Sequence, residues 1–158
     1  MKRLIGLTCL LFSSSILAVG SIESGNYQPF DIIADDYSMN DKPAFTFSFG
    51  KSKNDFFLFT AQCSIFDKKS HKTSTKGKRI PDISLEYHNT LTNQYMISES
   101  KFDDYINLEF FIKDKTFIFI FDGQLYDTSS NSLYKVLPQN VVLNAKEMRE
   151  IRDGCKKR

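Results

Sequence analysis

The chain has 158 residues, of which 41% are hydrophobic, and it carries 21 lysines and arginines against 19 aspartates and glutamates. This length predicts a single domain that buries a sizeable core. The nearly balanced charge gives no indication of a nucleic-acid partner, and the two histidines, three cysteines and absence of tryptophan leave few residues for a metal centre or for stacking on sugars.

The N-terminal segment has the three-part layout of a secretory signal peptide. A short positive start precedes an apolar stretch over residues 4–19, and small residues stand just before Ser21. The stretch is shorter than the about twenty apolar residues of a membrane-spanning helix and is interrupted by serines. We therefore expect residues 1–20 to be cleaved after Gly20, and the protein to be periplasmic or secreted.

Cleavage changes both the charge and the number of cysteines. Lys2 and Arg3 lie in the removed segment, so the mature chain has 19 basic and 19 acidic side chains and no net charge. Two cysteines remain, Cys63 and Cys155. An even number of cysteines in an exported protein predicts a disulfide between them.

The mature chain is expected to begin with a loosely ordered polar lead-in over residues 21–43, with one short strand. Residues 44–158 are predicted to form a single β-rich domain that ends in a helix. Apolar and polar residues alternate over residues 45–49 and again over residues 57–65, which predicts a β-hairpin.

Residues 67–79 are predicted to form a polar loop in which positive charge is concentrated. One interpretation is a binding site for an anionic lipid headgroup, a cell-wall polymer or an acidic protein surface. The alternative is that the lysines only keep a long loop soluble. No aromatic residue is interleaved with them, so stacking of single-stranded nucleic acid is not expected. The candidate binding residues are Lys68, Lys69, His71, Lys72, Lys76, Lys78 and Arg79.

Further strands are predicted around residues 83–87, 95–97, 106–112, 117–121 and 133–136. Residues 117–121 are apolar on both faces, which indicates a strand in the middle of a sheet. Two aromatic pairs, Phe56-Phe57 and Phe110-Phe111, also place large side chains on both faces of a strand. Packing between two layers explains such pairs, and an exposed patch for a partner is the alternative.

A C-terminal helix is predicted from Asn144 onward. Asn144 and Glu147 have the spacing of a capping box, and apolar residues recur at helical spacing after them. Gly154 is expected to end the helix in a left-handed conformation. Cys155 lies on the apolar face of the helix and Cys63 on the inner face of its strand, which supports their pairing.

These elements predict a mainly β fold with one C-terminal α-helix. The simplest arrangement is an antiparallel sandwich or partly closed barrel of about seven to eight strands with the helix packed on it, because strands of this kind need a second layer to bury their apolar faces.

No pattern of catalytic or metal-binding residues stands out. His71 and His88 are read as surface histidines and show no helical His-x-x-x-His spacing, so no metal and no cofactor are expected. Adjacent carboxylates occur at residues 35–36 and 103–104, and paired acids can serve a glycosidase. There is no Gly-x-Ser-x-Gly motif, and Cys63 has no thiolate to offer if it is oxidised.

The sequence therefore favours an exported, non-enzymatic protein that binds another protein, as an inhibitor, an immunity-type protein or a subunit of an envelope assembly. One alternative is a small secreted hydrolase or effector with a carboxylate or histidine site that the sequence does not identify. Another is a module that binds anionic envelope components through residues 67–79. No resemblance to a known family is found.

Overall fold

The computed structural model describes residues 18–34, 37–67, 70–79, 81–98, 102–113 and 116–156. The expected signal peptide lies outside the described residues except for its last three positions. Lys68 and Lys69 of the predicted basic site, and the carboxylate pair at residues 35–36, also lie outside them.

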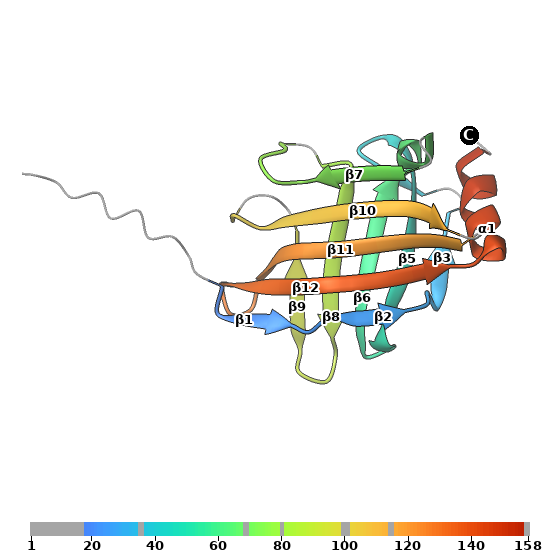
Figure 1. The fold of residues 1–158 in the computed structure, drawn as a ribbon. Coiled ribbons are helices and arrows are strands. Elements are labelled where there is room, and N and C mark those ends of the chain that lie inside the picture. Colours follow the sequence, from blue (N-terminus) through green and yellow to red (C-terminus); the bar gives the residue numbers. More distant parts are fainter. Residues whose placement is uncertain are drawn as a thin grey trace, which may run out of the picture.

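Within the described residues, twelve strands form one continuous sheet that folds into two layers, with the strands of one layer running across those of the other (Figure 1). The rear layer in this view contains β3 (Asp31–Ile33), β5 (Lys42–Ser52), β6 (Asp55–Gln62), β8 (Ile83–Asn89) and β9 (Gln94–Ile97), with the short β4 (Ser38–Met39) beside β5. The front layer contains β7 (Ser70–Ser74), β10 (Tyr105–Lys113), β11 (Thr116–Asp127) and β12 (Ser132–Leu143).

The two layers are joined where β9 pairs with the end of β11, at Met96 and Ile97. From there the strand order runs through β8, β6 and β5 to β3 in one direction, and through β11 and β12 to β1 in the other. Among the described strands β1 and β3 do not pair with each other, so the sheet is open rather than a closed barrel.

The structure confirms the mainly β fold with one C-terminal helix, but it has more strands than the sequence predicted. The lead-in does not hold one strand: it contributes β1 (Gly20–Ile22) and β2 (Gly25–Tyr27), which pair in parallel with β12, as well as β3 and β4. Cleavage after Gly20 would leave two of the three residues of β1 in place. These strands have two or three residues each, which is too short to show the period-two pattern.

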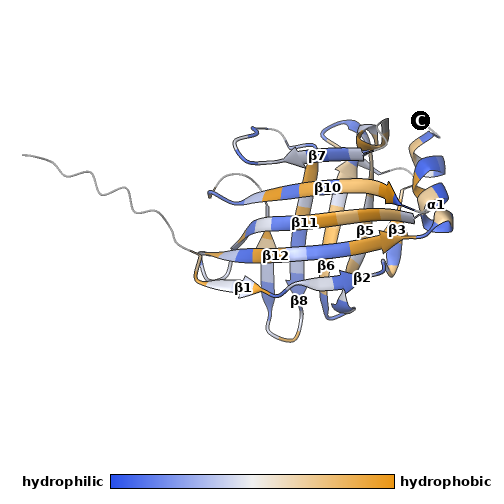
Figure 2. Ribbon diagram, in the orientation of Figure 1, coloured by the Kyte–Doolittle hydropathy of each residue, from blue (hydrophilic) through white to orange (hydrophobic). Residues whose placement is uncertain are grey.

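The core lies between the two layers and is dominated by phenylalanine. Inward-facing residues alternate with outward-facing ones along β5, β6, β10 and β11, as the pleat of a strand requires. The colouring in Figure 2 shows that hydrophobic residues gather toward the end of the front layer that lies near the helix. β11 lies between β10 and β12, which is the central position predicted for residues 117–121. The largest fully buried side chains include Phe45, Phe47, Phe49, Phe59, Phe110, Phe119 and Phe121.

The C-terminal helix α1 (Ala145–Lys156) begins with the predicted capping box. The Asn144 Oδ1 atom accepts hydrogen bonds from the backbone N–H groups of Lys146 at 2.8 Å and Glu147 at 3.1 Å, and the Glu147 carboxylate accepts one from the Asn144 N–H at 2.7 Å. Met148 and Ile151 are buried and join the core. In the described part of the chain, no helix is long and apolar enough to cross a membrane.

Gly154 does not end the helix as predicted, because α1 continues to Lys156. It is instead a packing position, buried against Ala34. A Cβ atom at residue 154 would lie 2.6 Å from the Ala34 Cβ and 2.8 Å from the Ala34 carbonyl carbon. The glycine therefore lets the helix approach the backbone just after β3.

We expect Gly154→Ala to lower the free energy of unfolding by about 1–3 kcal/mol, the usual cost of overpacking. Thermal and urea unfolding would measure the loss. Adding Ala34→Gly should restore only part of it, because the backbone of residue 34 still lies within 3 Å of the added methyl group. An unchanged stability of the single variant would contradict the close packing of α1.

A disulfide joins Cys63 to Cys155, with the two Sγ atoms 1.98 Å apart. Cys63 is not in mid-strand as predicted but is the first residue of the short 3₁₀ helix η1 (Cys63–Asp67), which follows β6 directly. The bond therefore connects η1 to the last turn of α1.

Candidate protein-binding surface

The predicted basic loop is not a single loop. Residues Ser70–Ser74 form β7, which pairs in antiparallel fashion with β10. His71 and Thr73 lie opposite the buried Phe110 and Leu108, and both side chains are half-buried. The prediction failed because hydrogen bonding to the free edge of β10, rather than an apolar pattern in the segment itself, makes this strand.

The three lysines of this segment that the structure describes each have a partner within the protein. The Lys72 Nζ atom lies 3.3 Å from Glu109 Oε2, and the Lys78 Nζ atom lies 2.8 Å from Asp82 Oδ1. Lys76 lies over the ring of Tyr105, 5.2 Å from its centroid. The Lys72 and Lys78 contacts place a carboxylate beside each of these two charges, whereas Lys76 keeps its charge over the Tyr105 ring. Arg79 is exposed.

A more distinctive surface lies on the outer face of the rear layer, where four rings follow one another. We call this set of residues the aromatic row: Phe30, Phe56, His88 and Tyr95. Phe56 pairs across the strands with His88, and His88 with Tyr95, so the three side chains share one face of the sheet. Phe56 and His88 stack at 4.9 Å, and the His88 and Tyr95 centroids are 4.8 Å apart.

Phe30 extends the aromatic row beyond β5. On β5 the residue opposite Phe56 is Gly50, which carries no side chain. Phe30 precedes β3, and its ring lies edge-on to Phe56 at 6.1 Å. Phe30 and Tyr95, at the two ends of the row, are 41% and 38% exposed.

The Glu86 carboxylate contacts the two polar members of the aromatic row, His88 and Tyr95. Its Oε2 atom accepts a hydrogen bond from the Tyr95 hydroxyl at 3.1 Å and lies 3.1 Å from His88 Nε2. Two half-buried apolar residues, Leu58 and Ile97, lie opposite Glu86 on the neighbouring strands. The row therefore has apolar ring faces and a polar edge at His88 and Tyr95, is held by stacking and hydrogen bonds, and is open to solvent at its ends.

The aromatic row is next to a shallow hollow of about 270 Å³ at the β8–β9 turn, which His88 and Tyr95 line. A histidine with a carboxylate partner beside a hollow is also an arrangement that acid–base catalysis can use. The other hydroxyl in the lining belongs to Thr90, whose Oγ1 atom lies 3.5 Å from the Asn54 carbonyl oxygen. The hollow therefore shows no paired nucleophile and base among its described residues.

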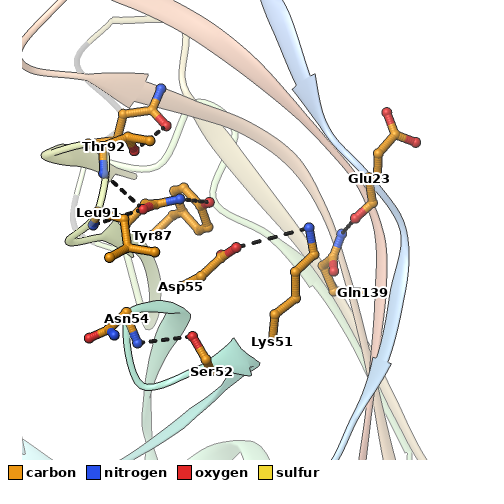
Figure 3. A network of polar contacts seen from close by, with 11 residues as sticks. Glu23, Lys51, Ser52, Asn54, Asp55, Tyr87, Leu91, Thr92 and Gln139 are labelled. Atoms are coloured by element: carbon orange, nitrogen blue, oxygen red, sulfur yellow. Dashed lines mark hydrogen bonds and ion pairs between the residues drawn. The ribbon is translucent and has the colours of Figure 1, made fainter.

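A second set of polar contacts lies near the β5–β6 and β8–β9 turns and extends from the buried Tyr87 to the exposed Lys51 (Figure 3). Burial raises the pKa of the Tyr87 hydroxyl and that of Tyr27, and the nearby Asp55 carboxylate raises both further. Lys51 Nζ lies 4.0 Å from the Asp55 carboxylate, and Tyr87 accepts a hydrogen bond from Asn89.

One buried atom in this region lacks a hydrogen-bond partner among the described residues. Gln139 is fully buried, and its Nε2 atom donates to the backbone oxygens of Glu23 at 2.8 Å and Leu137 at 2.6 Å. Its Oε1 atom is unpartnered in the described structure. The Glu23 contact ties the segment between β1 and β2 to β12.

The candidate catalytic residues do not come together. His71 lies on β7 and His88 on β8, in different layers. Asp103 is exposed, whereas Asp104 is buried and accepts a hydrogen bond from the Phe102 N–H at 2.9 Å. Within the described residues, no group of three or more histidine, cysteine, aspartate or glutamate side chains could hold a metal ion.

No protein-family model, no curated protein and no solved structure matches this chain. The aromatic pair at residues 56–57 was the one sequence signal for the aromatic row. His88, Tyr95 and Phe30 gave none, because only the strand register brings them beside Phe56.

Proposed function

We propose that this chain is an exported, non-enzymatic protein that acts by binding another protein, with the aromatic row as its contact surface. The observation that carries the proposal is the continuous set of rings across four separate segments of the rear layer. Aromatic residues are enriched in protein interfaces and account for much of their binding energy. Rings already held by stacking lose little conformational entropy when a partner covers them.

The residues of the signal peptide and the disulfide support export to an oxidising compartment. An inhibitor, an immunity-type protein and a subunit of an envelope assembly would each use a rigid contact surface of this kind. They differ in the partner, which is a target enzyme, a toxin or a neighbouring subunit.

The proposal is tested by photo-crosslinking in the native envelope. A benzoylphenylalanine in place of Tyr95 should give a single crosslinked protein of defined mass, whereas the same residue in place of the exposed Lys135 on β12 should not. With the purified partner, Tyr95→Ala and Phe30→Ser should each weaken binding about tenfold or more. Leu91→Ser is the matched control, since Leu91 is 79% exposed at the β8–β9 turn and lies outside the row.

Thermal unfolding of each variant would show that the fold is retained. Equal crosslinking from positions 95 and 135, or unchanged affinity of both row variants, would exclude the aromatic row as the contact surface.

A further inference from the structure

A hollow with positively charged walls lies where the end of α1 meets η1, beside the disulfide (Figure 1). It encloses about 390 Å³, which is within the range of small-molecule sites. Its lining consists of Cys63, Ser64, Phe66, Arg152, Cys155 and Lys156. It is far from the aromatic row in the fold, because η1 and α1 lie at the opposite end of the rear layer from the β8–β9 turn.

The wall of this hollow has two chemically different parts. Phe66 and the disulfide supply an apolar surface, and Phe66 is held in place by ring contacts with Phe45 at 4.8 Å and Phe110 at 5.8 Å. Arg152 and Lys156 supply two positive charges, and none of the lining residues is acidic. An apolar surface beside two cations matches a ligand that has an apolar part and a negatively charged group.

The cationic part is positioned by the helix. Arg152 and Lys156 are four residues apart on α1, so their side chains lie on the same side of it. The Arg152 guanidinium lies over the Phe117 ring, 5.0 Å from its centroid, which restrains the side chain while leaving its N–H groups available. A planar guanidinium held in this way can donate two hydrogen bonds to one carboxylate or phosphate.

We propose that this hollow binds a small amphiphilic anion, which is a single carboxylate or phosphate group attached to an apolar chain. Arg152 and Lys156 bind the anionic group, Ser64 is placed to add a hydroxyl hydrogen bond, and the chain lies against Phe66 and the disulfide. Because the disulfide joins η1 to α1, it holds the apolar and the cationic walls of the site together. A free amphiphilic acid and a membrane lipid both combine an anionic group with an apolar chain.

The test is calorimetry and amide NMR titration of the oxidised protein with octanoate, octyl phosphate, octanol and inorganic phosphate. Octanoate and octyl phosphate should bind and shift the amide signals of residues 63–66 and 152–156. Octanol and inorganic phosphate should bind at least about tenfold more weakly, because each lacks one half of the ligand. Equal binding of octanol or of inorganic phosphate would overturn the proposal, as would no binding of any probe at millimolar concentration.

Variants of residues on α1 distinguish binding in this hollow from a general effect of the positive charge on the helix. Arg152→Gln and Lys156→Gln should each weaken octanoate binding by about tenfold. Arg149→Gln removes the same charge from an exposed position on α1 outside the hollow and should leave binding unchanged. Equal effects at positions 149 and 152 would show a non-specific charge effect and overturn the site.

Vesicles distinguish the two sources of the ligand. If phosphatidylglycerol vesicles bind the protein and lose that binding in Arg152→Gln, the ligand is a lipid headgroup. If only monomeric octanoate binds, the ligand is a free amphiphilic acid. Either result supports the site, whereas vesicle binding that Arg152→Gln and Lys156→Gln leave intact, without octanoate binding, counts against it.

Discussion

Reduction of the Cys63–Cys155 disulfide is expected to lower the free energy of unfolding by about 4–5 kcal/mol. The bond spans 92 residues of sequence, so its loss greatly increases the number of conformations open to the unfolded chain. In the folded state it holds α1 to η1, next to the packing of Ile151 and Gly154. A loss of this size is a large part of the stability of a typical domain.

Urea unfolding followed by circular dichroism, with and without dithiothreitol, would measure this loss. The double variant Cys63→Ser/Cys155→Ser is the control, since it should match the reduced protein and show no response to the reductant. A difference below about 1 kcal/mol between oxidised and reduced protein would mean that the bond does not constrain the unfolded chain as the entropy model requires.

The features that the sequence predicted well are those that depend on residues close to one another. The alternation around Phe45–Phe49 and the cap at Asn144 are local patterns, and the structure confirms the strand and the capping box. The pairing of Cys63 with Cys155 followed from their number and from the faces on which they were expected to lie. Each of these inferences needed only a few neighbouring residues or a simple count.

The features that were missed depend on partners far away in the chain. β1 and β2 exist because they hydrogen-bond to β12, more than a hundred residues later. β7 exists because it pairs with β10. Gly154 was predicted to end the helix, because the residues next to it in the sequence do not show that Ala34 packs against it. Segments of two to five polar residues carry no signal of such pairings.

The same distinction applies to the candidate surfaces. Positive charge in residues 67–79 is obvious from composition, but the contacts of these lysines are not, because the partner of Lys72 is Glu109 on another strand. The rings of Phe56, His88 and Tyr95 belong to two different hairpins and gather only through strand register. The aromatic row therefore became visible only with the fold.

Phe47→Ala is expected to lower the free energy of unfolding by about 3–5 kcal/mol, the usual cost of removing a buried aromatic ring. Phe47 is 1% exposed and lies at the centre of the contact between the two layers. Its ring centroid lies 5.1 to 6.3 Å from those of five other phenylalanines, which come from both layers. These are Phe45, Phe49, Phe59, Phe119 and Phe121. The substitution would leave a cavity that rings from two layers cannot fill by a small shift.

Phe111→Ala is the matched control, because Phe111 is half-buried and alternates with the inward-facing Phe110 on β10. It should cost markedly less than Phe47→Ala, since the part of its ring already in water contributes little to the core. Urea unfolding of both variants at one pH and temperature would give the two values. If the two substitutions cost the same, the assignment of inner and outer faces to Phe110 and Phe111 on β10 would be wrong.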